Sequence, residues 1–331
     1  MPFTYRPMLK TKAGEATALL NLAPGEKNRI APVFHVAETP PATFAARMAA
    51  AWSGRTCFLD GSFNFNGSGT STDFDNTFLA LGASGIPVLP VIEIGAAHPY
   101  NLASFAHLNR FGPGLMLKCT PGNLPSASGF AQQMNVPQNQ IDLLIDGGHI
   151  SEYEPVSFAG YVSHILQTNL PGSQWRSVTL GSSSAPKDFG QLALGTTVVP
   201  RIDWLMWSNI VQPPAKPVDF ADFGISHRDL TEPPGIAMAA ATVSVRYTIA
   251  NNWVMIKGRR TTGATGVPMG HQYRAHAQTL RARPDFGGLP ICWADQRITS
   301  IATTTGSAGG RAQWVEINAN RHFTFIANTL P

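Results

Sequence analysis

The chain has 331 residues, 44% of them hydrophobic and 13% charged, with a formal net charge of +4. This composition allows a large buried core and argues against bulk disorder. The sequence contains no uninterrupted apolar run of about eighteen residues, and the segment MPFTYRPMLKTKAGE lacks an apolar signal core, so we expect a cytoplasmic protein that does not enter a membrane.

Segments that favour strands alternate with segments that favour helices over the first two thirds of the chain. Short apolar runs bounded by turn residues predict the strands, and apolar residues at helical spacing predict the helices. The predicted strands lie in residues 4–10, 29–38, 55–63, 86–95, 114–120, 141–150, 175–186 and 217–227. The predicted helices lie in residues 14–22, 40–52, 73–85, 99–111, 126–134, 155–169 and 187–211.

The strand centres are almost continuously apolar, which is typical of a parallel sheet covered by helices on both faces. Eight is also the number of strands at which such a sheet closes. We therefore predict an α/β fold, a single (β/α)8 barrel of the TIM type over residues 1–236. An open doubly wound sheet is the alternative, but no predicted strand leads into a GxGxxG turn.

The pattern changes in residues 237–331, which we expect to form an extension packed on the barrel. Residues 241–260 alternate as a β-hairpin around Asn251 and Asn252, residues 269–286 predict a basic amphipathic helix, and residues 311–328 predict a terminal strand or strand pair. Residues 246–283 contain seven Lys or Arg and no Asp or Glu. This uneven charge predicts contact with a phosphate or another anion, with a solvated basic face as the alternative.

The N-terminal segment YRPMLKTKAGEATALLNL resembles the opening of the phage-associated Beta protein family. The residues that carry the resemblance are Tyr5, Pro7, Leu9, Lys10, Lys12, Gly14, Glu15, Ala18 and Leu19. The segments RIAPVFHVAE, LLIDGGHI and QWVEINANRHFTF look like later parts of the same family. The family takes its name from a phage protein that protects the host from a lethal partner encoded beside it. The resemblance therefore implies a role in conflict between host and phage, and it supplies no mechanism.

Ionisable residues stand at the ends of the predicted strands. Active sites of TIM-type barrels lie at the carboxyl ends of the strands, so these side chains would meet at one mouth. In chain order they are Lys10, Lys12, Glu38, Asp60, Glu93, Lys118, Asp146, Asp222 and His227. Gly147 and Gly148 follow Asp146 and would let the backbone turn close to a ligand.

Two interpretations of this mouth remain open. Asp60, Glu93 and Asp146, with Glu38 and Lys118 as further catalytic candidates, could hold Mg²⁺ or Mn²⁺ or act as an acid and a base. The lysines, Lys10 and Lys12 included, would then face a phosphate. Alternatively, lysine–carboxylate pairs close the mouth structurally, and an error of one residue in strand parity would move a side chain outside.

Other candidates are individually ambiguous. His149 suits a base or a ligand but also a loop hydrogen bond, and Glu15 suits a helix N-terminus as well as catalysis. The serine-rich loop at 182–186 follows the seventh strand, where barrels often bind phosphate, although a loop without a ligand can have the same sequence. Three distant cysteines, Cys57, Cys119 and Cys292, predict reduced, buried thiols. We find no motif of a dedicated metal site.

Two functions therefore compete. The first is a binding protein, an immunity or antidote factor whose mouth and basic extension recognise an anionic ligand, a protein from a neighbouring gene, or a nucleic acid. Arg259 and Arg260, interleaved with Tyr247, Trp253 and Tyr273, would contact the nucleic acid, unless the aromatic residues pack on the barrel. The alternative is a metal-assisted hydrolase or phosphodiesterase acting on a nucleotide or nucleic acid.

Overall fold

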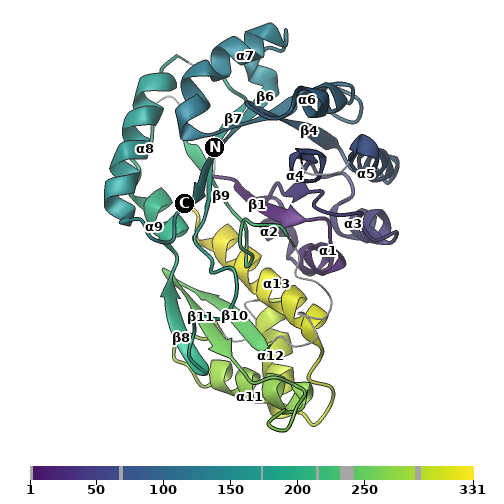
Figure 1. Cartoon of the computed structure of the whole chain (residues 1–331), viewed down its shortest axis with the longest axis vertical. Coiled ribbons are helices and arrows are strands. Elements are labelled where there is room, and N and C mark those ends of the chain that lie inside the picture. The colour runs from purple at the N-terminus through teal and green to yellow at the C-terminus, as the bar shows by residue number, and fades with distance from the viewer. Residues whose placement is uncertain (1–2, 67–69, 173, 214–215, 232–241, 288–291) are drawn as a thin grey trace.

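The computed structural model describes residues 3–331 apart from 67–69, 173, 214–215, 232–241 and 288–291. Eight parallel strands close into a barrel in the order β1-β2-β3-β4-β5-β6-β7-β9, with helices around its outside (Figure 1). The predicted TIM-type barrel is thus confirmed. The barrel strands are β1 Tyr5–Lys10, β2 Val33–His35, β3 Cys57–Asp60, β4 Val88–Glu93, β5 Leu115–Cys119, β6 Ile141–His149, β7 Ser177–Ser183 and β9 Val218–Asp222.

The helices of the barrel part follow their strands as the sequence predicts. They are α1 Ala13–Leu20, α2 Pro24–Lys27, α3 Phe44–Trp52, α4 Ser62–Asn66, α5 Ser71–Ala83, α6 His98–Phe105, α7 Ala127–Gln133, α8 Pro155–Asn169 and α9 Ile202–Asn209, with 3-10 turns at Pro121–Ser126 and Gln138–Gln140. Most of the predicted helices correspond to one of these elements. The short helices α2 and α4 were not anticipated, because four or five residues carry too little periodicity to be recognised.

The alternation of side chains along each strand fixes which residues point into the barrel. An inner cluster contains Met8, Phe58, Val91, Met116 and Leu144, whereas their strand neighbours pack in the larger cluster beneath the helices. Because successive side chains of a strand face opposite ways, the residue two positions further along also points inward. The strand ends at Lys10, Asp60, Glu93, Lys118 and Asp146 therefore meet inside the mouth.

A second, three-stranded antiparallel sheet has the order β10-β11-β8 (Figure 1). β10 Ser244–Ile249 and β11 Asn252–Lys257 form the predicted hairpin, although its two-residue turn is Ala250-Asn251, one position earlier than predicted. β8 Gly195–Pro200 lies between β7 and α9 in the sequence, but it is not part of the barrel and pairs with β11. The prediction of helix across residues 187–211 is therefore wrong in its first half. The run GTTVVP is rich in β-branched residues, which favour the edge of a sheet over a helix.

Among the described residues of the C-terminal part are the helices α11 Met269–Arg281, α12 Trp293–Thr303 and α13 Arg311–Thr329. The basic helix predicted in residues 269–286 is confirmed as α11, whereas α12 was not predicted. The terminal strand or strand pair predicted for residues 311–328 is wrong, because this segment is the long helix α13. Its buried side chains lie on several faces, since α13 packs against α1 on one side and β10 on another. Burial all round hides the one-sided apolar stripe that identifies a helix.

Asp222 joins the barrel to α13 and does not face the mouth. The adjacent residue of β9, Ala221, belongs to the inner cluster. Successive side chains of a strand face opposite ways, so Asp222 points outward. Its carboxylate accepts hydrogen bonds from the Tyr5 hydroxyl (2.6 Å) and from His322 Nε2 (2.9 Å). The other ring nitrogen of His322 contacts Thr248 Oγ1 at 2.9 Å. The prediction of Asp222 as a mouth residue is therefore wrong in strand parity.

The charge of Asp222 is retained by its partners. Burial alone would raise the pKa of this carboxyl, but His322 and Arg201 hold it below the usual value. Arg201 is itself fully buried, with its guanidinium 3.8 Å from the carboxylate. The linkage Tyr5–Asp222–His322 thus spans the first strand, the last barrel strand and the last helix.

We expect Tyr5→Phe to lower the free energy of unfolding by about 1.5–3 kcal/mol, because it removes a buried hydrogen bond to an ionised acceptor. Tyr153→Phe is the matched control, since Tyr153 is 52% exposed, and it should change the value by less than about 0.5 kcal/mol. Urea unfolding followed by circular dichroism measures both. Equal stability of the two variants would contradict the role of this linkage.

Candidate functional site

Lys118 lies at the centre of the barrel mouth. Its Nζ is 2.7 Å from Asp60 Oδ2 and 3.0 Å from Glu93 Oε2, so one ammonium bridges carboxylates from β3 and β4. Asp60 is fully buried, and it also accepts hydrogen bonds from Tyr100 OH (3.1 Å) and from the Ser62 backbone N–H (2.8 Å). Three predicted catalytic residues therefore do meet, but they satisfy one another.

The protonation of this cluster follows from its charges. Burial favours the neutral form of Asp60, yet Lys118 and His35 outweigh it and hold the pKa of Asp60 well below its usual value. Burial also opposes the charge of Lys118, and Asp60 and Glu93 reverse that effect and raise the pKa of Lys118. Both groups therefore remain charged near neutral pH, which does not suit a proton exchange between them.

The remaining carboxylates predicted at the mouth are paired as well. Asp146 contacts Arg228 at 2.9 Å and accepts from the Gly148 N–H. Gly148 has φ +82°, a backbone conformation that favours glycine, and a Cβ there would lie 2.9 Å from the Arg228 guanidinium. Glu38 lies beyond the end of β2 and pairs with Lys12 at 3.2 Å. Within the parts of the chain that the structure describes, no group of three or more His, Cys, Asp or Glu is arranged to hold a metal ion.

Lys10 and Glu15 both line a small cavity at the mouth. Glu15 is buried, and the cavity is also lined by Phe223 and by Ala319 of α13. The residue of β2 that does point into the mouth is His35, whose Nδ1 is 3.4 Å from Asp60. Sequence reasoning missed His35, because β2 ends at His35 and not at Glu38 as predicted.

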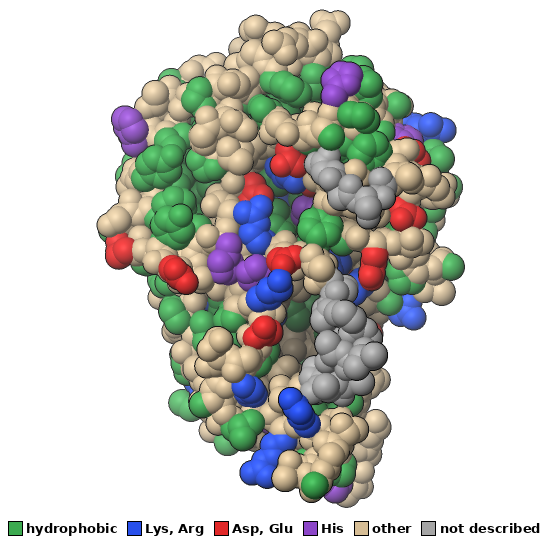
Figure 2. Space-filling model, viewed as in Figure 1, with side chains coloured by type: hydrophobic (Ala, Val, Ile, Leu, Met, Phe, Trp, Pro, Cys, Tyr) green, Lys and Arg blue, Asp and Glu red, His purple; other side chains and the backbone are tan. Residues whose placement is uncertain are grey.

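His149 and His227 come together at the rim of the mouth, with ring centroids 4.4 Å apart. His149 Nε2 lies 2.8 Å from Ser151 Oγ, and His227 Nδ1 accepts from the Asp229 N–H. Burial is the first cause that lowers the pKa of both rings, and neighbouring positive charges add to it. Both imidazoles are therefore neutral at pH 7. Figure 2 shows acidic, basic and histidine side chains gathered in a band from the barrel toward the C-terminal part.

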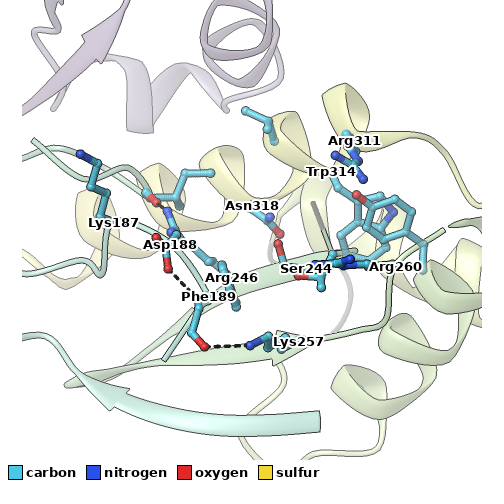
Figure 3. Close-up of a pocket in the computed structure, with 15 residues that line it drawn as sticks. Lys187, Asp188, Phe189, Ser244, Arg246, Lys257, Arg260, Arg311, Trp314 and Asn318 are labelled. Atoms are coloured by element: carbon cyan, nitrogen blue, oxygen red, sulfur yellow. Dashed lines mark hydrogen bonds between the residues drawn. The ribbon is translucent and has the colours of Figure 1, made fainter. Parts of the chain in front are cut away.

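A pocket of about 600 Å³ lies between the barrel rim and the C-terminal part. The loop after β7, the loop after β9, the hairpin β10–β11 and the helices α11 and α13 all contribute to its walls. Figure 3 places Arg260, Arg311 and Trp314 toward one end and Lys187 and Asp188 toward the other. The cationic lining side chains are Lys187, Arg246, Lys257, Arg260 and Arg311, and Asp188 is the carboxylate among the described lining residues.

Two cations of this pocket, Arg246 and Lys257, are held in place by neutral backbone groups, whereas Lys187 is paired with Asp229. Arg246 donates to the backbone carbonyls of Ile225 and Pro186, and Lys257 donates to those of Gly190 (3.1 Å) and Leu192 (2.8 Å). Burial lowers the pKa of Arg246 to about 10, so its guanidinium is still charged at neutral pH. Carbonyls carry no net charge, and the pocket keeps a positive potential suited to an anion.

The two predicted arginines differ. Arg260 lines the pocket, is exposed, and forms no ion pair with the described residues, whereas its neighbour Arg259 is exposed but does not line the pocket. Tyr247, Trp253 and Tyr273 are buried, and Tyr247 and Tyr273 pack in the C-terminal hydrophobic cluster and not on the barrel, as the alternative had it. Sequence reasoning missed Lys187, Arg311 and Asn318, which come from distant segments; only the excess of charge in residues 246–283 pointed to this region.

The three cysteines are free and buried, as predicted. Burial raises the pKa of Cys57, Cys119 and Cys292 to about 12 each. A thiol that stays protonated is a poor nucleophile and a poor metal ligand. They belong to the packing of the molecule.

We expect Lys118→Met to lower the free energy of unfolding by about 3–5 kcal/mol at pH 8, because it leaves Asp60 buried without its cation. In the variant the folded-state pKa of Asp60 should rise above its unfolded value of about 4. A raised pKa gives stability at low pH that is lost as the pH rises through it, so the deficit should shrink at pH 5.

The double variant Lys118→Met/Asp60→Asn is the control, and it should recover a large part of the loss at pH 8. Urea unfolding at the two pH values measures all three proteins. A single variant as stable as the parent at pH 8, or a deficit that grows on acidification, would contradict this account of the pair.

Comparison with known proteins is informative at the level of the family. No curated protein matches the chain. Over the described residues, no helix has the length and apolar character that crossing a bilayer requires. The family model described as Beta protein matches residues 5–328, nearly the whole chain. The opening and closing segments that suggested the family lie within this match, and the chain belongs to the Beta protein family.

Proposed function

We propose that this protein is an immunity or antidote factor of host–phage conflict, acting in the cytoplasm by binding an anionic ligand or partner at the carboxyl-end face of its barrel. The single observation that carries the proposal is the pocket of about 600 Å³, whose described lining contains five cationic side chains, Lys187 being paired with Asp229 outside the lining, and one carboxylate. The resemblance of the opening segment to the phage-associated family supports the biological setting.

The pocket extends the site that the sequence placed at the mouth. It borders the mouth through the segment after β9, where Arg228 pairs with Asp146 and Asp229 pairs with Lys187. A partner that carries negative charge would therefore approach the barrel rim and the C-terminal part together. Its association should be steered by the positive field and weakened by salt.

The mouth gives the hydrolase alternative no comparable support. Lys118 occupies the space between Asp60 and Glu93, where a divalent cation would have to bind them jointly. A cation at that point would meet an ammonium that its neighbours keep charged. Binding is the function that the paired carboxylates of the mouth and the cationic lining of the pocket favour.

Co-expression tests the antidote role. We expect the chain to restore colony formation in cells that produce the lethal product of the adjacent phage gene, and Arg260→Glu to abolish most of this rescue. Arg259→Glu is the matched control, because it makes the same charge change one residue away from the pocket lining, and it should rescue like the parent. Protein levels are compared by immunoblot.

Absence of rescue by the parent chain would overturn the antidote role. Equal loss in both arginine variants would show that general surface charge, and not the pocket, governs the effect.

A further inference from the structure

We infer that the basic pocket binds a nucleotide, with the phosphates against its cationic side chains and the sugar or base hydrogen-bonded to Asn318. The inference rests on the proposed function, since it names the class of anion that the same pocket takes. It is carried by the position of the pocket in the barrel, by its charge, and by an unsatisfied polar group in its wall.

The position of the pocket suits phosphate. Lys187, Asp188, Phe189 and Gly190 belong to the loop after β7, the seventh barrel strand, and Ile225 follows β9, the eighth. In barrels of this type the loops after the seventh and eighth strands frequently form a phosphate-binding site. The sequence pointed to the serines at 182–186, but Ser182, Ser183 and Ser184 are buried, and the loop residues that line the pocket come just after them.

The charge of the pocket calls for more than one negative group. Arg246 and Lys257 are oriented by backbone carbonyls, which carry no net charge, while Arg260 has no ion pair among the described residues. Arginine and lysine at fixed positions bind phosphate oxygens through charge-assisted hydrogen bonds. A ligand with a chain of phosphates would satisfy cations at several points of the pocket, which a single carboxylate would not.

Asn318 indicates that the ligand also brings a hydrogen-bond donor. This side chain of α13 is 6% exposed, lines the pocket, and its buried Oδ1 accepts no hydrogen bond from the described residues. Figure 3 shows Asn318 between the two ends of the pocket. An unsatisfied buried acceptor costs about 1–3 kcal/mol, which a donor on the ligand would recover. Phosphate oxygens are acceptors, so the donor belongs to a hydroxyl or amino group of a sugar or base.

The size and walls of the pocket agree with a whole nucleotide. A volume of about 600 Å³ exceeds what a phosphate alone would fill, and it falls in the range typical of small-molecule sites. Phe189, Ile225, Trp314 and Val315 supply apolar wall between the cations. A nucleotide combines an apolar ring face with a charged tail, and this division of the lining matches both parts.

Isothermal titration calorimetry on the full chain at low salt tests the assignment. The probes are the four ribonucleoside triphosphates, the corresponding nucleosides, pyrophosphate, and a short single-stranded oligonucleotide. We expect at least one triphosphate to bind, with its nucleoside and pyrophosphate each weaker by about tenfold or more. Arg260→Glu should weaken the triphosphate by about tenfold or more, and Arg259→Glu by less than about twofold.

Asn318→Leu separates recognition of the phosphates from recognition of the rest. It should weaken the triphosphate and leave pyrophosphate unchanged. Pyrophosphate binding as tight as any triphosphate, with Asn318→Leu silent, would overturn the nucleotide and leave the anion-binding antidote standing. An oligonucleotide that binds more tightly, with equal losses in both arginine variants, would overturn the pocket in favour of an extended strand. Binding of no probe would overturn the inference, whereas the antidote role stands or falls by the co-expression rescue.

Discussion

The arrangement of this molecule depends on one buried carboxylate. Asp222 is enclosed completely, and an ionised group can be buried at tolerable cost only where donors and opposite charge surround it. Its donors come from the first strand and from the last helix, so the two ends of the chain must meet there. Tyr5 and His322 both lie in the segments by which the sequence resembles its family. The contact places α13 where its other residues, Trp314 and Asn318 among them, complete the wall of the basic pocket.

Local pattern was enough to predict the barrel, because each of its strands is a short apolar run followed by an independent helix. It failed where a segment depends on distant partners. β8 is a strand because β11 offers it an edge, and α13 has apolar residues on several faces because it lies between α1 and β10. Neither partner is visible from the segment itself. Asp222 shows a finer limit, since a shift of one residue decides between the mouth and the outside of the barrel.

The mouth could be predicted in part because strand alternation is a local property. Side chains two residues beyond an inward apolar residue also point inward, which places Asp60, Glu93, Lys118 and Asp146 together. What strand ends do not reveal is who neutralises whom: Arg228 reaches Asp146 from a loop 82 residues away. The pocket was beyond prediction because its lining comes from five elements, and only its surplus of positive charge left a trace in the sequence. The charge distribution thus indicated the chemistry of the site but not which residues line it.

The excursion of β8 has a consequence for how the chain is made. During synthesis β8 emerges between two barrel strands, yet its partner β11 is translated only later, with Gly195 pairing with Lys257. Until then its β-branched residues lack the strand with which they pair, and such segments are prone to pairing with other chains. A fragment that stopped at residue 236 would permanently retain β8 without its partner, so the barrel is not a self-contained half of the protein.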